Sequence, residues 1–204
     1  INWTPLSDYL PQIGVSGIAV DHTNSNIIYI ATGDKDASDS YSIGVLKSLD
    51  GGITWNTTGL TFTNTSTLAS EIFMHPSNPD ILWVATSVGL YKTINAGVTW
   101  VQKLGGNVKD IKLKPGNPDV IYAVTPNRFY RSTNTGDSFT VVTTGLPTTS
   151  GRLLLDVTAA NTEYVYILSA TTGDAFQGIY RSTNGGTNWT RTSGTTDVFE
   201  STQA

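Results

Sequence analysis

The chain has 204 residues, of which 38% are hydrophobic and 14% are charged, and its net charge is −4. The acidic balance argues against nucleic-acid binding, and the lack of cysteine excludes disulfides and cysteine-ligated zinc. No apolar run approaches the ~20 residues of a membrane span, so we expect none. Abundant Thr, Ser, Asn, Gly and aromatic residues are typical of β-structure with many turns.

The first expected element is a strand at residues 2–6, because Trp3 and Thr4 align with Trp55 and Asn56, which open a later strand. A hairpin pattern follows at 17–32, GIAVDHTNSNIIYIAT, in which two apolar runs flank a polar turn. The same pattern returns at 71–86, 110–125 and 154–169.

A short strand and a turn follow each hairpin. The first turn reads KSLDGGITW at 47–55, and altered copies stand at 92–100, 131–139 and 181–189. Each turn leads into a strand that opens on Trp or Phe. Four strands repeated every ~40–50 residues are the period of a β-propeller blade. We therefore predict an all-β chain of four-stranded antiparallel blades without helices longer than a turn or two.

The first turn resembles the Asp-box, or BNR, repeat of sialidase-like and sortilin-like propellers, S-x-D-x-G-x-T-W, through Ser48, Asp50, Gly52, Thr54 and Trp55. The chain also resembles propeller proteins secreted by Bacteroidetes, many of which are labelled glycosyl hydrolases. This resemblance implies that residues 1–204 form part of a larger propeller of about seven blades. We expect four complete blades at 15–59, 70–104, 108–144 and 152–193, with 2–6 as the outer strand of a preceding blade and 194–204 as a connection to a further one.

The turn residues are expected to be structural, because Asn replaces Asp in three of four copies and keeps only the hydrogen-bond acceptor. Glycine two positions later permits a backbone that side chains disfavour, and the aromatic residue buries apolar surface. The structural set is Ser48, Asp50, Gly52, Trp55, Thr93, Asn95, Gly97, Trp100, Ser132, Asn134, Gly136, Phe139, Ser182, Asn184, Gly186 and Trp189. The basic residues before the turns, Lys47, Lys92, Arg131 and Arg181, occupy equivalent positions and are also expected to be architectural.

A ligand would bind the opposite face, where the loops after each second strand lie in this fold. These loops are short in the second and third repeats but long at 33–42 and 171–178, and such insertions often mark a binding face. Two innermost strands also begin on carboxylates, which either face a central channel or hydrogen-bond a neighbouring strand. The candidate ligand-binding residues are Asp34, Asp36, Asp39, Tyr41, Glu71, Asp110, Asp174 and Phe176.

Three readings stay open for the acidic loop with Asp34, Asp36 and Asp39. We expect no cofactor, with Ca²⁺ as the alternative, because clustered carboxylates suit this ion although the loop lacks the EF-hand pattern. A looser resemblance to the two-propeller endoglucanases that cut xyloglucan implies that Asp34 is a catalytic candidate, but it needs a second carboxylate across a cleft. The third reading is a solvated acidic surface.

Sialidase activity is not expected, because the Arg-Ile-Pro signature is absent. We expect a non-catalytic binding or scaffolding segment of a larger secreted or cell-surface bacterial protein, with glycan or protein as ligand. Its further partners would be the remaining blades of its precursor and, through the Bacteroidetes resemblance, the type IX secretion machinery. The alternative function is glycoside hydrolysis.

Overall fold

The computed structural model describes residues 10, 14–35, 40–63 and 66–194, and within them every regular element is a strand. The chain divides into two compact units, 1–106 and 107–204. The first unit holds β1 (Val15–Val20), β2 (Ile28–Thr32), β3 (Gly44–Ser48), β4 (Asn56–Thr61), β5 (Ala69–His75), β6 (Asn78–Thr86), β7 (Gly89–Thr93) and β8 (Val101–Gly105).

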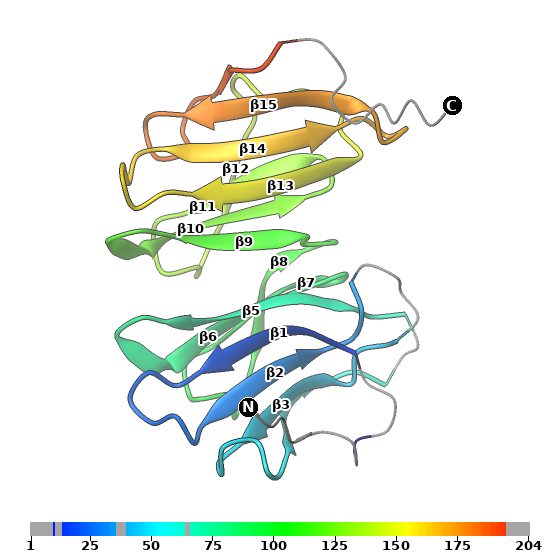
Figure 1. Cartoon of the computed structure of the whole chain (residues 1–204), viewed down its shortest axis with the longest axis vertical. Helices are drawn as coiled ribbons and strands as arrows, with labels where there is room; N and C mark the ends of the chain where they lie inside the picture. Colours follow the sequence, from blue (N-terminus) through cyan, green and yellow to red (C-terminus); the bar gives the residue numbers. More distant parts are fainter. Residues whose placement is uncertain (1–9, 11–13, 36–39, 64–65, 195–204) are drawn as a thin grey trace, which may run out of the picture. The chain divides into compact units, whose positions relative to one another are not determined.

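The second unit holds β9 (Asp110–Lys114), β10 (Asn117–Thr125), β11 (Arg128–Ser132), β12 (Thr140–Val142), β13 (Arg152–Val157), β14 (Val165–Ala170), β15 (Phe176–Ser182) and β16 (Thr190–Arg191). Within each group of four, consecutive strands pair antiparallel and form one meandering sheet (Figure 1). The predicted all-β class and the four-stranded antiparallel sheets are confirmed. The strand expected at 2–6 lies outside the described residues.

Alternation along the second strand of each sheet decides which side chains meet the neighbouring sheet. In β2, Tyr29 and Ala31 point to one face and Ile30 to the other, as the two-residue period of a strand requires. The face with Tyr29 and Ala31 packs with Val84 and Leu82 of β6 in one apolar cluster. This cluster joins the first two sheets into one unit.

The second unit repeats this arrangement with larger side chains. Tyr122 and Phe129 of the third sheet pack with Trp189, Leu155 and other residues of the fourth sheet. Phe129 makes an edge-to-face contact with Trp189 at 4.8 Å between ring centroids and stacks on Tyr122 at 5.8 Å. Phe129 occupies in the third sheet the register position that the smaller Val45 occupies in the first.

Innermost strands approach each other closely within each unit. A Cβ added at Gly17 of β1 would lie 2.9 Å from the backbone nitrogen of Ile72 in β5, so a side chain would not fit there without a shift. Asp110 holds the same repeat position in β9, and its Oδ2 accepts a 3.0 Å hydrogen bond from the Leu155 backbone N–H of β13. Both units thus bring the same two strand positions together.

Candidate functional site

The four repeat turns, Ser48–Trp55, Thr93–Trp100, Ser132–Phe139 and Ser182–Trp189, share one hydrogen-bond pattern. In the first turn, the Ser48 hydroxyl donates to Asp50 at 2.8 Å and accepts from the Gly52 N–H at 2.8 Å. Asp50 then accepts from the Thr54 N–H at 2.8 Å. The equivalent bonds span 2.9–3.1 Å in the other three copies. The geometry supports a structural role for this motif.

The exchange of Asp for Asn reverses one hydrogen bond without changing the turn. Asp50 Oδ2 accepts from the Thr54 hydroxyl at 2.6 Å, whereas Asn95 Nδ2 donates to the Thr99 hydroxyl at 2.9 Å. A hydroxyl both donates and accepts, so it serves either partner. The hydrogen bonds from Thr54 hold the pKa of Asp50 at about 2. The fourth turn has Asn188 in place of the hydroxyl residue.

Each turn is also tied to the inner hairpin of its own sheet through one backbone N–H. The donors are Gly51, Ala96, Thr135 and Gly185, which bond to the carbonyls of Asn26, Asp80, Asp119 and Glu163 at 2.8–3.0 Å. The φ angles of these four donors lie between +54° and +75°. Two of these residues, Ala96 and Gly185, also accept side-chain hydrogen bonds through their carbonyls.

In the first unit, the turn carbonyl of Ala96 accepts hydrogen bonds from two side chains of the preceding sheet. The Tyr29 hydroxyl and Lys47 Nζ each donate to it at 3.1 Å, and Lys47 lies 5.0 Å over the Tyr29 ring. Burial raises the pKa of Tyr29 to about 12 and lowers that of Lys47. We call this donation from a basic side chain to the turn carbonyl of the next sheet the cation–carbonyl contact.

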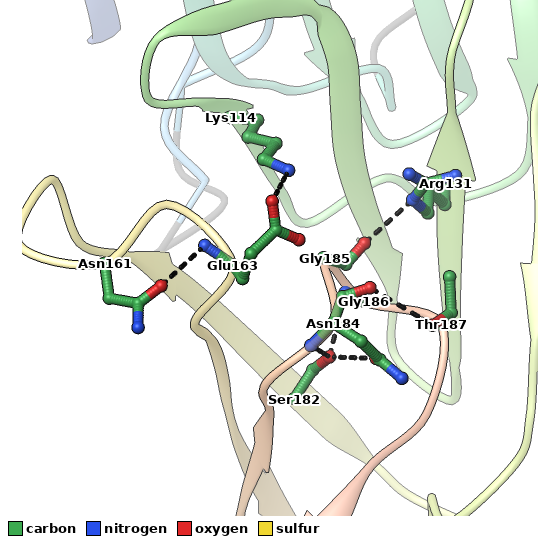
Figure 2. Close-up of polar contacts among 9 residues, drawn as sticks. All are labelled: Lys114, Arg131, Asn161, Glu163, Ser182, Asn184, Gly185, Gly186 and Thr187. Atoms are coloured by element: carbon green, nitrogen blue, oxygen red, sulfur yellow. Dashed lines mark hydrogen bonds and ion pairs between the residues drawn. The ribbon is translucent and has the colours of Figure 1, made fainter.

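In the second unit, the cation–carbonyl contact runs from Arg131 Nε to the Gly185 carbonyl at 2.8 Å (Figure 2). An ion pair between Lys114 and Glu163 joins the same two sheets. Burial raises the pKa of Tyr122 to about 12. The nearby positive charge of Arg131 opposes this rise. The buried Tyr122 hydroxyl has no partner with hydrogen-bond geometry among the described residues. Lys47 and Arg131 are therefore architectural, as their repeat positions predicted.

The long loop of the first sheet is anchored at its base by two serine side chains. Ser40 Oγ accepts from the Gly14 N–H at 2.6 Å, and Ser16 Oγ donates to the Gly33 carbonyl at 2.6 Å. Half-buried Asp34 lines a depression of about 360 Å³ with Gly14, Val15, Ser16, Gly33 and Lys35. Tyr41 is exposed, while Asp36 and Asp39 lie outside the described residues. The role of this loop as a site stays a prediction.

The long loop of the fourth sheet places its two candidates differently. Asp174 is exposed, has φ +63° and lines a cavity of about 400 Å³ with Arg152, Leu154, Leu168 and Ala170. Phe176 is buried at the start of β15, so its ring is not displayed on the loop surface. Sequence reasoning missed Arg152, which is set apart only by its position at the start of β13.

The two innermost-strand carboxylates also differ. Asp110 is buried, and its two oxygens accept hydrogen bonds from Lys112 Nζ at 2.6 Å and from the Leu155 N–H. This geometry favours the strand-joining alternative over ligand binding. Glu71 is half-buried and lines a depression between β1 and β5. Within the described residues, no group of three acidic or histidine side chains could hold a metal ion.

No helix among the described residues is long and apolar enough to cross a membrane. No protein-family model matches the chain, and no curated protein matches it. Solved structures that match the fold are those of β-propeller proteins. An ancestral GH74 enzyme matches with a TM-score of 0.71 and 26% identity, covering 95% of this chain and 26% of that protein.

Two further structures share the fold at lower identity. YCF48 from Cyanidioschyzon merolae has a TM-score of 0.58 and 15% identity over 92% of this chain and 58% of its own. The extracellular domain of BT4673 from B. thetaiotaomicron has a TM-score of 0.59 and 15% identity over 89% of this chain and 22% of its own. The chain therefore spans less than two thirds of each of these proteins, and at 15% identity the likeness concerns the fold alone.

Proposed function

We propose that the four repeat turns are Asp-boxes of the sialidase-like and sortilin-like superfamily and that the chain is a segment of a propeller of about seven blades. The blades are those expected at 15–59, 70–104, 108–144 and 152–193. The shared hydrogen bonds of the turns support this assignment, because each copy uses the same hydroxyl, Asx oxygen and glycine N–H.

The function that the geometry supports best is binding or scaffolding within a larger secreted or cell-surface bacterial protein, with a glycan or protein as ligand. The observation that carries it is the long 33–42 loop, whose Asp34 lines a depression while the second and third sheets join the same strands by short turns. The sheets do not need the extra residues, so the loop is free to serve a ligand. The Bacteroidetes resemblance supports export through the type IX machinery.

Glycoside hydrolysis is the second candidate, and the 26% identity to the ancestral GH74 enzyme favours it. Asp34 follows the second strand of the first sheet and would be the catalytic acid or base. Such chemistry needs a second carboxylate ~5–9.5 Å away. Among the described residues that line the depression, Asp34 is the only carboxylate. Binding without catalysis therefore has the stronger support from this chain.

Calorimetric titration with xyloglucan oligosaccharides, together with a reducing-end assay, separates these functions. Binding without new reducing ends, lost in Asp34→Asn and kept in Asp80→Asn, supports a glycan-binding loop. Release of reducing ends that depends on Asp34 supports the hydrolase. Equal titration curves for the wild type and Asp34→Asn contradict a glycan-binding role for this loop.

Calcium is tested by changing Asp34, Asp36 and Asp39 together to Asn. If calcium orders the loop, Ca²⁺ raises the unfolding temperature of the wild type but not that of the triple variant. An equal response of both proteins contradicts a calcium site in this loop.

A further inference from the structure

The fourth repeat turn holds the only Asn-Gly pair of the chain, Asn184-Gly185. In such a pair the glycine backbone nitrogen attacks the asparagine side chain more readily than in other pairs, because glycine has no side chain to obstruct the approach. The nitrogen gives up its proton and bonds to Cγ, the Cγ–Nδ2 bond breaks, and ammonia leaves a five-membered succinimide ring. Water then opens the ring to aspartate or isoaspartate, so the net reaction consumes one water and releases one ammonia.

The folded turn restrains both reacting groups. Gly185 is buried, and its N–H donates to the Glu163 carbonyl at 3.0 Å. The nitrogen must lose this proton before it attacks, so burial and the hydrogen bond keep it from the hydroxide that would remove it. Asn184 Oδ1 accepts a hydrogen bond from the Ser182 hydroxyl at 2.9 Å (Figure 2). A second hydrogen bond, from the Asn188 N–H at 3.0 Å, also holds the side chain within the turn. The closed turn therefore opposes ring closure.

The third sheet holds this turn closed. Arg131 Nε donates to the Gly185 carbonyl at 2.8 Å, and Lys114 forms an ion pair with the Glu163 carboxylate (Figure 2). Both residues that form the hydrogen bond from the Gly185 N–H to the Glu163 carbonyl are thus bound by cations of the third sheet. Separation of the third and fourth sheets therefore loosens the restraint on the Gly185 nitrogen.

The other three repeat turns each lack one requirement of the reaction. Asn95 and Asn134 are followed by residues with a side chain, which hinders the attacking nitrogen. In the first turn Asp50 precedes Gly51, but the hydrogen bonds from Thr54 lower the pKa of Asp50 to about 2, so its carboxylate is ionised at neutral pH. An ionised carboxylate resists attack because it has no good leaving group. Only the fourth turn combines an amide with a following glycine.

We propose that Asn184 is a conditional deamidation site, which is protected while the third and fourth sheets are in contact and reacts when they separate. The two products have different consequences. Aspartate keeps the acceptor oxygen, and Asp50 shows that the turn forms with this residue. Isoaspartate lengthens the main chain by one methylene, so the N–H and carbonyl of Gly185 no longer lie where Glu163 and Arg131 meet them. Isoaspartate therefore weakens the contact between the two sheets.

Mass spectrometry of peptides tests the site and its protection together. The chain is incubated at mildly alkaline pH, either folded or in urea, and then digested with pepsin at acid pH, where the reaction is slow. We expect residue 184 to convert at least ~tenfold more slowly in the folded chain, because the reaction then waits for local opening. Asn134, at the same turn position without a following glycine, is the internal control and should stay largely unconverted in both conditions.

Gly185→Ala tests the role of the glycine itself. Ala96 holds the same turn position in the second sheet with φ 54°, so alanine fits this turn. The variant should fold, and its residue 184 should convert more slowly in urea than that of the wild type, because a side chain now hinders the attacking nitrogen. Equal rates in urea would show that the Asn-Gly pair is not the cause of the reaction and would overturn the proposal.

Two further variants test whether the sheet contact controls the reaction. Arg131→Ala removes the donor to the Gly185 carbonyl and should raise the rate at residue 184 in the folded chain about tenfold, because loss of a hydrogen bond from a charged donor favours the open state by about that factor. Arg191→Ala on β16 removes the same charge beside the Gly194 carbonyl and should leave the rate unchanged. In urea both variants should react like the wild type, since no sheet contact remains.

Three results would overturn the proposal. Equal rates in the folded and the unfolded wild type would show that the turn gives no protection. A rate in urea that is no higher at Asn184 than at Asn134 would show that the site is not reactive. Equal rates in folded Arg131→Ala and Arg191→Ala would show that the third sheet does not hold the turn closed. If circular dichroism shows that Arg131→Ala is unfolded, Lys114→Ala, which removes the ion pair to Glu163, takes its place and should still react faster than Arg191→Ala.

Discussion

The two units form the same contact between neighbouring sheets with different hydrogen-bond donors. In the first, Tyr29 and Lys47 share the Ala96 carbonyl. In the second, Arg131 donates to the Gly185 carbonyl, and among the described residues the Tyr122 hydroxyl has no partner with hydrogen-bond geometry. The backbone geometry of the contact is kept while the side-chain chemistry changes. In both units a side-chain donor meets the turn carbonyl of the next sheet, and the residue type that supplies it varies.

Truncation of a buried tryptophan should give the largest difference in stability between the two units. Trp189 is 5% exposed and packs edge-to-face on Phe129, whereas Trp100 of the first unit is half-buried. We expect Trp189→Ala to lower the free energy of unfolding by ~3–5 kcal/mol and Trp100→Ala by less, since large cavities cost most in a filled core. Urea unfolding of each variant measures this. Equal losses would show that the two units are packed alike.

Loss of the basic side chain from each cation–carbonyl contact should give the second largest difference in stability between the two units. Arg131→Ala leaves the carbonyl of buried Gly185 without this donor and should cost ~1–3 kcal/mol. Lys47→Ala leaves Ala96 bonded to Tyr29 and should cost ~1 kcal/mol or less. Denaturant unfolding of both variants checks the order. A larger loss from Lys47→Ala would refute the idea that Tyr29 shares the carbonyl.

The two tyrosine hydroxyls give a matched pair with opposite expectations. Tyr29→Phe removes a hydrogen bond and should cost ~1 kcal/mol. Tyr122→Phe removes a buried hydroxyl for which the described residues provide no partner with hydrogen-bond geometry, so it should be neutral or stabilising. Thermal and urea unfolding of the two variants measure the difference. Destabilisation by Tyr122→Phe equal to that of Tyr29→Phe would reveal a partner for the second hydroxyl.

The charge of the first repeat turn should have the smallest effect. Asp50→Asn should cost little at pH 7, because Asn95 shows that Asn can donate to the hydroxyl at the position of Thr54. The hydrogen bonds from Thr54 lower the pKa of Asp50 from 3.8 to about 2. A depressed pKa adds stability above pH ~4 that is lost as pH falls towards ~2. Stability measured across this range should fall less in Asp50→Asn; parallel profiles would show that the carboxylate adds no pH-dependent stability.

The sequence predicted the local structure because its determinants are close in the chain. Ser48, Asp50 and Gly52 form their turn from neighbouring residues, and the alternation in β2 directs Tyr29 and Ile30 to opposite faces whatever lies beyond them. The repeat period then predicted four-stranded sheets and the architectural position of Lys47 and Arg131. The candidate loop at 33–42 was recognised by its length and its three aspartates.

Only the tertiary structure decided which distant groups meet. That Asp110 bonds to the Leu155 backbone, that Phe176 is buried and that Tyr29 finds a carbonyl while Tyr122 does not all depend on packing between sheets. The partners of such side chains lie 45 to 67 residues away in the chain. Identical repeat positions in the sequence therefore acquire different partners, because hydrogen bonding and burial depend on the neighbouring sheet, and no local pattern encodes that neighbour.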